Sequence, residues 1–430
     1  MKKLLFVLFL AVILVFAGCS PDDEELDDIE AAEDAGENGE NENEEENAGE
    51  PETNAESEAD AESEEDGETE TEEPTEPPPP PLSPFIITSP YAGVDWSGFG
   101  QYKAALHVHS TNSDGDDTLA DIIEEYYRQD YDILAITDHD YLTADWVSAR
   151  NGLTQKRFDE ISAGSDRNGR GMLQIPYTNE QSGGEHLNTF FTDFNNPGSG
   201  ASLEKNINIT RGLDGICRIN HPGCYTGGKV IGKAGVNASQ DPENISKYTD
   251  LFSKYSCCVG MEIITNKDAE SFNDRILWDN ILTQTVPQGR YVWGFSDDDA
   301  HNTADAGYCF NIFVMPENSL DNFKEAMYSG SFYAVSRISR SRRELGNASV
   351  STAPVPVILE ITVDNENSAV ITITAAYCDK IEWISNGRII AKGDTIDIEK
   401  YKKKIGCYVR ANIIGPGGIA FTQPFGVSLR

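Results

Sequence analysis

The chain has 430 residues and a formal net charge of −40, with 73 acidic residues against 33 basic ones. Residues 20–81 hold 29 of the acids and no Lys or Arg, which leaves a net charge of −13 for residues 82–430. This excess of acid argues against an extended nucleic-acid surface built on Lys and Arg. About 350 residues is too many for one small core, so we expect two domains.

The N-terminus has the pattern of an export signal. Two lysines precede a 14-residue apolar run, residues 4–17, which is shorter than the roughly 20 residues of a membrane-spanning helix. The segment Phe16-Ala17-Gly18-Cys19 resembles a bacterial lipobox, although an aliphatic residue is usual at the position of Phe16. We expect residues 1–18 to be a lipoprotein signal peptide, with Cys19 lipidated and the protein anchored outside the cytoplasm on the bacterial cell membrane. Ordinary secretion with an incidental Cys19 is the alternative.

Residues 19–83 predict a disordered acidic tether. They contain few large apolar side chains and include a proline run at residues 77–81. Such a segment cannot bury enough apolar surface to offset the entropy of ordering, and the prolines form a stiff spacer. A calcium-binding or adhesive role for the acidic run is the alternative.

The next residues predict one βαβ unit. Residues 102–109 form a strand-like run that ends in His107 and His109, whose i and i+2 spacing places both on one strand face. Asp117-Thr118 can cap a helix over residues 119–127, where apolar residues recur at helical spacing. A buried strand over residues 133–136 then ends at Asp138 and His139.

The same rhythm continues to residue 350. Strand-like runs occur at residues 172–177, 187–194, 215–219, 259–264, 291–295 and 311–315, and a helical pattern at 320–327. Polar residues stand beside these runs: Glu180, His186, His221, Asp299 and His301. Side chains gathered at the carboxyl ends of parallel strands are typical of a β/α barrel. We expect residues 84–350 to form this α/β domain.

After residue 350 the pattern changes to short β-branched runs separated by turn residues. This predicts a small C-terminal antiparallel β-sandwich domain over residues 351–430. It contains no histidine, so we expect it to pack against the site or shape it. In an exported protein some cysteines can pair, and Cys378 with Cys407 is the best local candidate.

The chain's six histidines all stand beside strand-like runs, several with a carboxylate close by. Imidazole and carboxylate are the ligands of Zn, Mn and Fe. The pattern predicts a multinuclear metal site, the alternative being six unrelated histidines.

These residues occur in motifs: His107-Val-His109-Ser110 with Ser113-Asp114-Gly115, Asp138-His139, Glu180 then His186, Asn220-His221-Pro222, and Asp299-Ala300-His301. In this order they resemble the PHP (polymerase and histidinol phosphatase) superfamily over residues 102–335. The segment Phe421-Thr-Gln-Pro-Phe resembles, more weakly, the close of its exported CehA/McbA-like branch.

The resemblance implies a distorted (β/α)7 PHP barrel that holds two or three divalent ions, Mn, Zn or Fe. One ion would bind His107, His109, Glu180 and Asp299; a second Glu180, His186 and His221; and a third Asp114, His139 and His301. Asp138 and Glu262 are as well suited to orienting the histidines as to binding metal. Asp114 could instead belong to a plain Asp-Gly turn, and for Asp297 and Asp298 we expect a solvated acidic turn.

Clustered cations lower the pKa of a bridging water and clamp the oxygens of a displacement at phosphorus. We therefore expect a metal-dependent hydrolase of phosphate mono- or diesters acting on small substrates, with Glu180, Asp299 and His301 catalytic. Arg150, Arg218 and Arg337 are candidates for phosphate contacts, with surface salt bridges as the alternative for each. Hydrolysis of a carboxylic or carbamate ester on the same metals is a second hypothesis. A third is a metal-loaded, lipid-tethered binding protein without catalysis.

Overall fold

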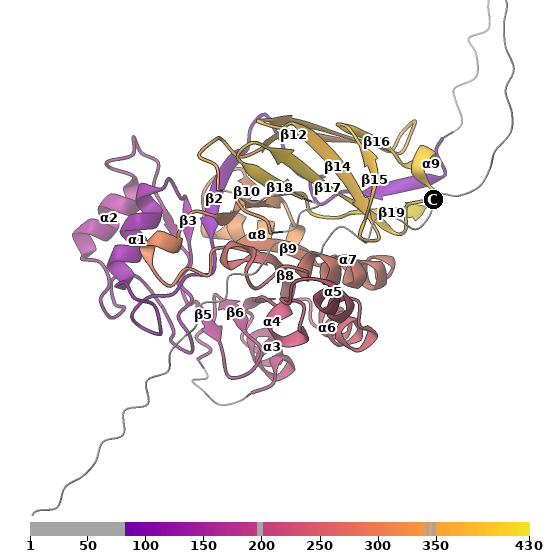
Figure 1. The fold of residues 1–430 in the computed structure, drawn as a ribbon. Coiled ribbons are helices and arrows are strands. Elements are labelled where there is room, and N and C mark those ends of the chain that lie inside the picture. The colour runs from indigo at the N-terminus through magenta and orange to yellow at the C-terminus, as the bar shows by residue number, and fades with distance from the viewer. Residues whose placement is uncertain (1–81, 196–200, 341–343, 346–349) are drawn as a thin grey trace, which may run out of the picture. The chain divides into compact units, whose positions relative to one another are not determined.

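Strands from both ends of the chain pair in one large sheet (Figure 1). The structure is a computed structural model that describes residues 82–195, 201–340, 344–345 and 350–430. The large sheet runs in the order β1 (Phe85–Thr88), β19 (Phe425–Leu429), β17 (Tyr408–Gly415), β18 (Gly418–Phe421), β11 (Phe332–Ser336), β10 (Cys309–Met315), β2 (Gly100–Ala105), β3 (Ile133–Leu134) and β4 (Leu173–Gln174). Two further strands, β14 (Lys380–Ser385) and β15 (Arg388–Lys392), extend it from β17. Within this sheet β2, β3 and β4 are parallel.

A second sheet of five strands carries much of the histidine-bearing chain. Its order is β5 (Asn179–Gln181), β6 (Leu187–Phe190), β7 (Ile216–Ile219), β8 (Cys258–Thr265) and β9 (Trp293–Asp297). Strands β7, β8 and β9 are parallel, whereas β6 runs antiparallel to both β5 and β7. A third sheet consists of β12 (Val357–Asp364), β13 (Val370–Ala376) and β16 (Thr395–Asp397).

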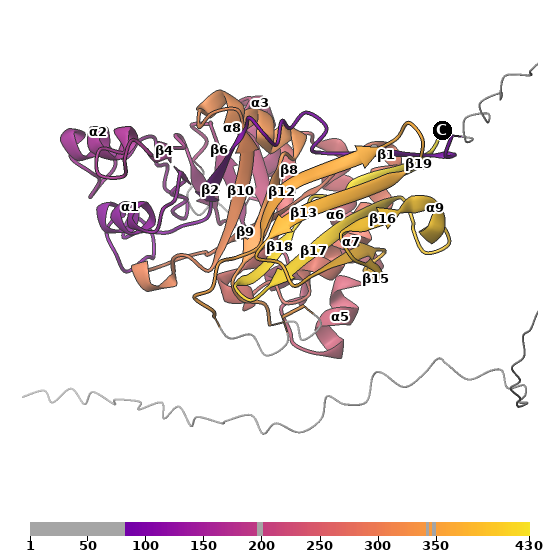
Figure 2. The same cartoon turned by 90° about the horizontal axis from the view of Figure 1, so that it is seen from above.

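The helices flank these sheets (Figure 2). They are α1 (Leu119–Arg128), α2 (Gln155–Ala163), α3 (Leu203–Gly212), α4 (Gly223–Thr226), α5 (Lys233–Ser239), α6 (Pro242–Lys254), α7 (Asp274–Thr285), α8 (Leu320–Ser329) and α9 (Ile398–Tyr401). Three short 3-10 helices, η1 (Asn266–Asp268), η2 (Val286–Gln288) and η3 (Thr303–Asp305), complete the described elements. Helix α3 packs on β6 and β7, and α6 and α7 pack on β8.

Helix α1 forms where the apolar spacing predicts it. The Thr118 side chain accepts the Asp121 N–H and caps the first turn. The residues that recur at helical spacing are all buried in the core: Leu119, Ile122, Ile123, Tyr126 and Tyr127. This face fixes α1 beside the strands that carry the first histidines.

The mixed α/β class is as predicted. The described strands are divided between separate sheets, so the finer expectation of a distorted (β/α)7 barrel is not confirmed. The main departure is β6. Only residues 182–186 join it to β5, and so short a connection permits an antiparallel hairpin but no parallel crossover. His186 therefore precedes the first residue of a strand and does not follow its carboxyl end.

The C-terminal strands are continuous with the preceding domain. Strand β18 pairs with β11, and β19 pairs with the N-terminal β1. The third sheet shares a buried apolar core with strands of the large sheet, through residues such as Ile371 and Trp383. The expected boundary at residue 350 is nevertheless crossed by backbone pairing, because the large sheet belongs to both sides of it.

Several expectations fall on residues that are not described. The signal peptide, Cys19 and nearly all of the tether lie outside the described ranges. Within those ranges, no helix combines the length and the apolar character that crossing a membrane would require. Cys378 and Cys407 are not bonded to each other: both are free thiols, and Cys407 faces the Leu282 carbonyl of α7.

Candidate metal centre

All six histidines of the chain lie in one cluster. Their ring centroids are 5.1 Å apart for His107 and His109, 4.4 Å for His109 and His139, 5.0 Å for His139 and His186, 5.1 Å for His186 and His221, and 5.6 Å for His221 and His107. The sixth ring, His301, stacks on His109 at 4.4 Å. Residues nearly 200 positions apart thus meet at one point of the fold.

The strand ends bring these residues together. His107 and His109 follow β2, His139 follows β3, His221 follows β7, and Asp299 follows β9. Isolated bridges join Val108 to Ala300 and His139 to Glu180 across the gap between the sheets. His221 and Asp299 have positive φ angles of 23° and 50°, a backbone conformation that L-residues rarely adopt and that is often found at functional sites.

Glu180 lies at the centre of the cluster and is fully buried. Its Oε1 faces three imidazole nitrogens, His107 Nε2 at 3.2 Å, His186 Nδ1 at 3.0 Å and His221 Nε2 at 3.5 Å. Its Oε2 faces two others, His139 Nδ1 at 2.8 Å and His109 Nε2 at 3.5 Å. Each carboxylate oxygen therefore points at a different set of histidines, as a carboxylate that bridges two cations would.

Asp299 faces the first two histidines. Its Oδ1 lies 3.2 Å from His107 Nε2 and 3.0 Å from His109 Nε2. Burial alone would raise the pKa of the Asp299 carboxyl, but His107 and His109 outweigh it and hold that pKa below its ordinary value. Burial likewise opposes the charged form of His107, yet Asp299, Glu180 and Glu262 raise the pKa of its imidazole well above the ordinary value. The carboxylates around His107 therefore favour a positively charged group at this position.

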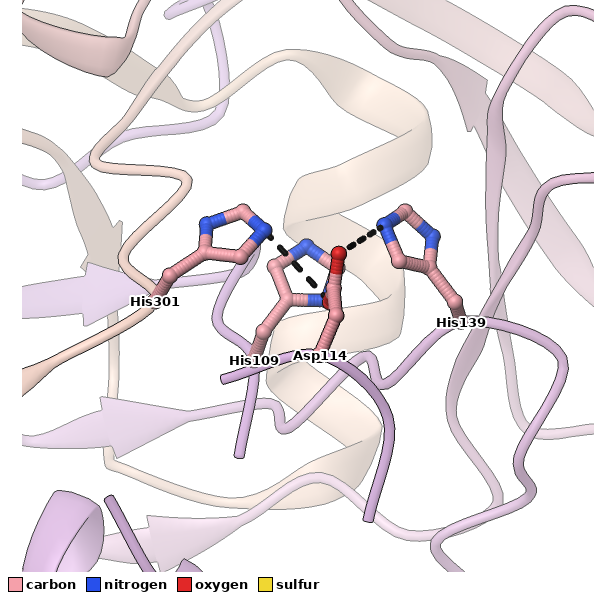
Figure 3. A group of neighbouring side chains, drawn as sticks. All are labelled: His109, Asp114, His139 and His301. Carbon is pink, nitrogen blue, oxygen red and sulfur yellow. Dashed lines mark ion pairs between the residues drawn. The ribbon is translucent and has the colours of Figure 1, made fainter. Parts of the chain in front are cut away.

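A third group lies at the more exposed side of the cluster (Figure 3). Asp114 Oδ2 is 3.5 Å from His139 Nε2, and Asp114 Oδ1 is 3.5 Å from His301 Nε2 and 3.9 Å from His109 Nδ1. The Asp114 side chain is 56% exposed and His301 34%, whereas His109 is fully buried. This side of the cluster is therefore the one that is open to solvent.

The donor atoms fit divalent ions. The nitrogens that face the acids in His107, His109, His139 and His186, together with Glu180 Oε2, are buried and have no hydrogen-bond partner among the described residues. These atoms lie within ion-pair distance of one another but form no hydrogen bond, and burying a polar atom without one costs about 1–3 kcal/mol, so a cation shared among them would offset that cost. Imidazole nitrogen and carboxylate oxygen in groups of three and four suit Zn, Mn or Fe.

A buried network behind the cluster orients His107. Its Nδ1 lies 2.7 Å from Glu262 Oε1, which leaves Nε2 directed at Glu180 and Asp299. Glu262 Oε2 accepts the backbone N–H of His221 at 2.9 Å, and the Arg218 guanidinium donates to Glu262 Oε1 at 3.1 Å. These hydrogen bonds match the orienting role considered for Glu262, and its carboxylate also converges with His107 and His221 in a group that could hold an ion.

Asp138 forms hydrogen bonds with the loop that follows His109. Its carboxylate accepts the Ser110 N–H at 2.7 Å and the Ser113 hydroxyl at 2.9 Å. It holds the loop that carries Asp114, and it is absent from the groups of described residues whose ligand atoms converge.

One sequence expectation near the site is wrong. Asp297 and Asp298 are buried and do not form a solvated turn. Asp297 pairs with Arg218 and accepts the Leu106 N–H, and Asp298 accepts three backbone N–H groups of residues 307–309. Burial raises the pKa of each of these two carboxyls to about 6.

Two of the three arginines proposed as phosphate contacts are engaged in other interactions. Arg218 is fully buried behind the cluster, where its charge balances Asp297 and Glu262. Arg337 donates to the carbonyls of Ser351 and Ala353, and Arg150 is exposed on a loop. The position of Arg218 inside an apolar strand was the signal in the sequence that it needs a buried acidic partner.

Other residues beside the cluster were not singled out from the sequence. Cys224 and Glu270 form a further convergent group with His221, and the Cys224 thiol donates to Glu270 at 3.3 Å. The Tyr225 ring lies 5.6 Å from that of His186 and 6.0 Å from that of His221. Cysteine and tyrosine carry no motif at these positions, so only the fold reveals their proximity.

The C-terminal strands support the site from a distance. The Gln423 side chain accepts the Gly294 N–H at 2.8 Å and donates to the Gly294 carbonyl at 2.9 Å, which fixes the start of β9. Strand β9 leads directly to Asp297, Asp298 and Asp299. The C-terminal region therefore helps to position β9 but supplies no ligand to the described cluster.

Comparisons with known proteins give local and distant similarities. No family model matches the chain. Over 61 residues the chain is 38% identical to the DNA polymerase/3'-5' exonuclease PolX of Bacillus subtilis (strain 168), a match that covers 14% of this chain and 10% of the polymerase. The chain thus spans about a tenth of the length of this curated relative.

Two solved structures illustrate the structural similarity. A two-domain protein from Bacteroides vulgatus, described as containing a predicted PHP-like metal-dependent phosphoesterase, has a TM-score of 0.40 at 16% identity, covering 77% of this chain and 88% of the other. The lesion-specific endonuclease PfuEndoQ from Pyrococcus furiosus has a TM-score of 0.33 at 15% identity, covering 53% of this chain and 56% of the other.

Proposed function

We propose that this chain is a metal-dependent phosphoesterase of the PHP type that hydrolyses phosphate mono- or diesters. The observation that carries the proposal is the convergence of all six histidines on Glu180, Asp114 and Asp299, with buried donor atoms that lack hydrogen bonds. The motif order in the sequence supports the same assignment. Membership of the CehA/McbA-like branch belongs to the proposal as well.

Together, the nine expected ligands would bind two or three divalent ions. Glu180 would bridge, because its two oxygens face separate sets of histidines. Asp114, His139, His301 and His109 would hold the more exposed ion. Here the geometry departs from the assignment by resemblance, since it places His109 in two groups and His139 between Glu180 and Asp114. When bound, such ions supply an activated water and stabilise charge on the phosphoryl oxygens.

His301 is suited to moving protons during the reaction. Its Nδ1 lies 2.9 Å from the Asp299 carbonyl, to which it can donate, so that Nε2 carries the lone pair and faces the open side. In the hydrolysis, the oxygen of water forms a bond to phosphorus while the bond from phosphorus to the ester oxygen breaks. The proton released by water reaches the leaving oxygen. With two ions bound at Glu180, His301 Nε2 would carry that proton; with a third, more exposed ion bound, the same nitrogen would serve as a metal ligand instead.

Location and partners are also proposals. The export signal and Cys19 support a lipoprotein that works outside the cytoplasmic membrane on small phosphorylated or ester substrates. The net charge of −13 for residues 82–430 supports the view that no extended nucleic-acid surface is present.

The test is a two-substrate assay with metal control. Protein stripped by a chelator should lose hydrolysis of p-nitrophenyl phosphate and regain it with Mn or Zn; full activity in excess chelator contradicts the metal requirement. Faster turnover of p-nitrophenyl acetate than of the phosphate would favour the carboxylic or carbamate ester hydrolase. Metal-loaded protein that is inert toward a broad panel of both ester types would favour a binding protein.

A further inference from the structure

The loop that follows His221 exposes apolar side chains next to the metal centre. Val230 is 49% exposed, Ile231 62% and Tyr225 39%. Among the described residues, Val230 and Ile231 are the only large hydrophobic residues adjacent in sequence that are both exposed to this degree. Single exposed apolar residues are ordinary on protein surfaces, whereas three within seven residues make this loop a candidate contact surface.

This loop is tied to the site through Tyr225. The Tyr225 ring is nearly parallel to the His221 ring, with an interplanar angle of 28°, and it also contacts the His186 ring. Tyr225 belongs to α4, which begins two residues after His221, so this short helix joins the loop to the cluster.

The backbone of the loop is firmly held, so the exposure is built into the fold. Gly223 accepts the Lys229 N–H at 3.1 Å and donates its own N–H to Asp274 Oδ2 at 3.0 Å. The Asn273 side chain donates to the carbonyls of Gly228 at 2.7 Å and Val230 at 3.0 Å. These bonds keep the backbone in place while the aliphatic side chains of residues 230 and 231 face solvent.

The charge of the loop opposes that of the rest of the protein. Residues 215–240 contain no Asp or Glu, although residues 82–430 as a whole carry a net charge of −13. Lys229 and Lys233 flank the two aliphatic residues, and neither lies within ion-pair distance of a carboxylate in the described part of the chain. The Glu270 carboxylate accepts the Cys224 thiol and Asp274 accepts the Gly223 N–H, and neither carboxylate forms an ion pair with Lys229 or Lys233.

We propose that residues 225–233, the docking loop, seat the protein on an anionic lipid bilayer, and that the metal centre takes the phosphate ester of a lipid headgroup. Aliphatic side chains that enter the interface, flanked by lysines and a tyrosine, match the chemistry of a bilayer surface. The substrate class rests on the proposed phosphoesterase function, whereas docking of the loop does not.

The test separates docking from catalysis. Protein that begins at Ser20, and so carries neither Cys19 nor the apolar run of residues 4–17, is mixed with vesicles of phosphatidylcholine containing phosphatidylglycerol or phosphatidic acid. The double variant Val230→Ser/Ile231→Ser should sediment with vesicles about tenfold less, since two apolar side chains no longer enter the interface. Its release of phosphate from phosphatidic acid should fall in parallel, and its hydrolysis of p-nitrophenyl phosphate should be unchanged. Leu359→Ser, an equally exposed residue on β12, is the matched control and should change nothing.

Charge is tested separately with Lys229→Ser/Lys233→Ser, which should lose the preference for anionic vesicles and the sensitivity of binding to salt. Parent protein that does not bind vesicles, or a double variant that binds as well as the parent, overturns the docking loop. A change of the double variant from dimer to monomer would assign the surface to a second copy and overturn it too. Vesicle binding without hydrolysis of any phosphate ester leaves docking intact and overturns the proposed function and its substrate class.

Discussion

His107 and Glu262 form a fully buried pair in which Nδ1 and Oε1 are 2.7 Å apart. This contact selects the tautomer of His107 that leaves Nε2 free to face Glu180 and Asp299. The same glutamate accepts the His221 N–H, so it positions two of the histidines at once. A residue that binds no substrate can thereby set the geometry of the whole centre.

Replacing Glu262 by Gln should lower the affinity for metal about 10–100-fold and leave the fold intact, because the side-chain volume is kept while the orienting charge is lost. Metal titration and circular dichroism measure the two effects. Glu382→Gln is the matched control: Glu382 is also buried but pairs with Lys380 and Lys392 on β14 and β15. Equal metal affinity in both variants would contradict the orienting role.

Glu180→Ala should abolish hydrolysis and remove more than one equivalent of metal, because each of its oxygens faces a different set of histidines. Elemental analysis of purified protein gives the count. Glu185→Ala, which removes a nearby glutamate paired with Lys247, should keep the full metal content. Loss of one ion or none from the Glu180 variant is incompatible with a bridge.

Much of the site could be predicted because its residues carry local signals. The motif residues from His107 to His301 stand beside strand-like runs, and strand ends are where a fold of this class gathers its polar groups. Thr118 and the apolar spacing after it likewise predicted α1 correctly. In each case the signal lies within a few residues of the feature.

The incorrect predictions concern contacts between residues that lie far apart in the sequence. Three consecutive aspartates suggest a solvated turn, and nothing local shows that residues 307–309 would donate three N–H groups to Asp298. Arg218 donates a hydrogen bond to Asp297, which lies 79 residues further along the sequence. The pairing of β18 with β11 crosses the expected domain boundary, because an edge strand of one segment completes the sheet of another, and strand periodicity does not specify its partner.

Asp274 should make stability depend on pH in the direction opposite to most carboxylates. Burial raises the pKa of Asp274 to about 8, although the Gly223 N–H lowers it. Between about pH 4 and pH 8 the folded chain keeps a proton that the unfolded chain has released, so this stabilisation is complete below pH 4 and is lost as the pH rises through 8. Asp274→Asn should therefore be more stable than the parent at pH 8, on the order of 2 kcal/mol, with no gain at pH 4.

Chemical denaturation at several pH values measures this difference. Asp364→Asn replaces an exposed carboxylate whose pKa is lowered by its hydrogen bonds to Asn367 and Ser368, and it should not raise stability at pH 8. A parallel shift of the Asp274→Asn stability curve at every pH would show that the carboxylate is ionised when buried.

Removal of residues 1–83 should yield a folded protein with full activity, because the acidic segment has no apolar pattern with which to join a core. In the full-length chain, Cys19→Ser should move the protein from the membrane fraction to the soluble one. Washing membranes with high salt before fractionation removes the contribution of the docking loop lysines. A Cys19→Ser protein that still resists extraction would mean that residues 4–17 are retained as the anchor.

Asp114 distinguishes the exposed group of ligands from the two buried ones. As a carboxylate facing His139 and His301, it should make this position prefer Mn or Fe over Zn, since oxygen ligands suit harder ions. Asp114→Asn should lower the occupancy of this position alone and leave the ions at Glu180 in place, which anomalous scattering at the metal edges can resolve. Asp116→Asn, an exposed neighbour in the same loop, serves as the control. If Asp114→Asn keeps both the metal content and the rate of the parent, then Asp114 does no more than shape the turn at Gly115.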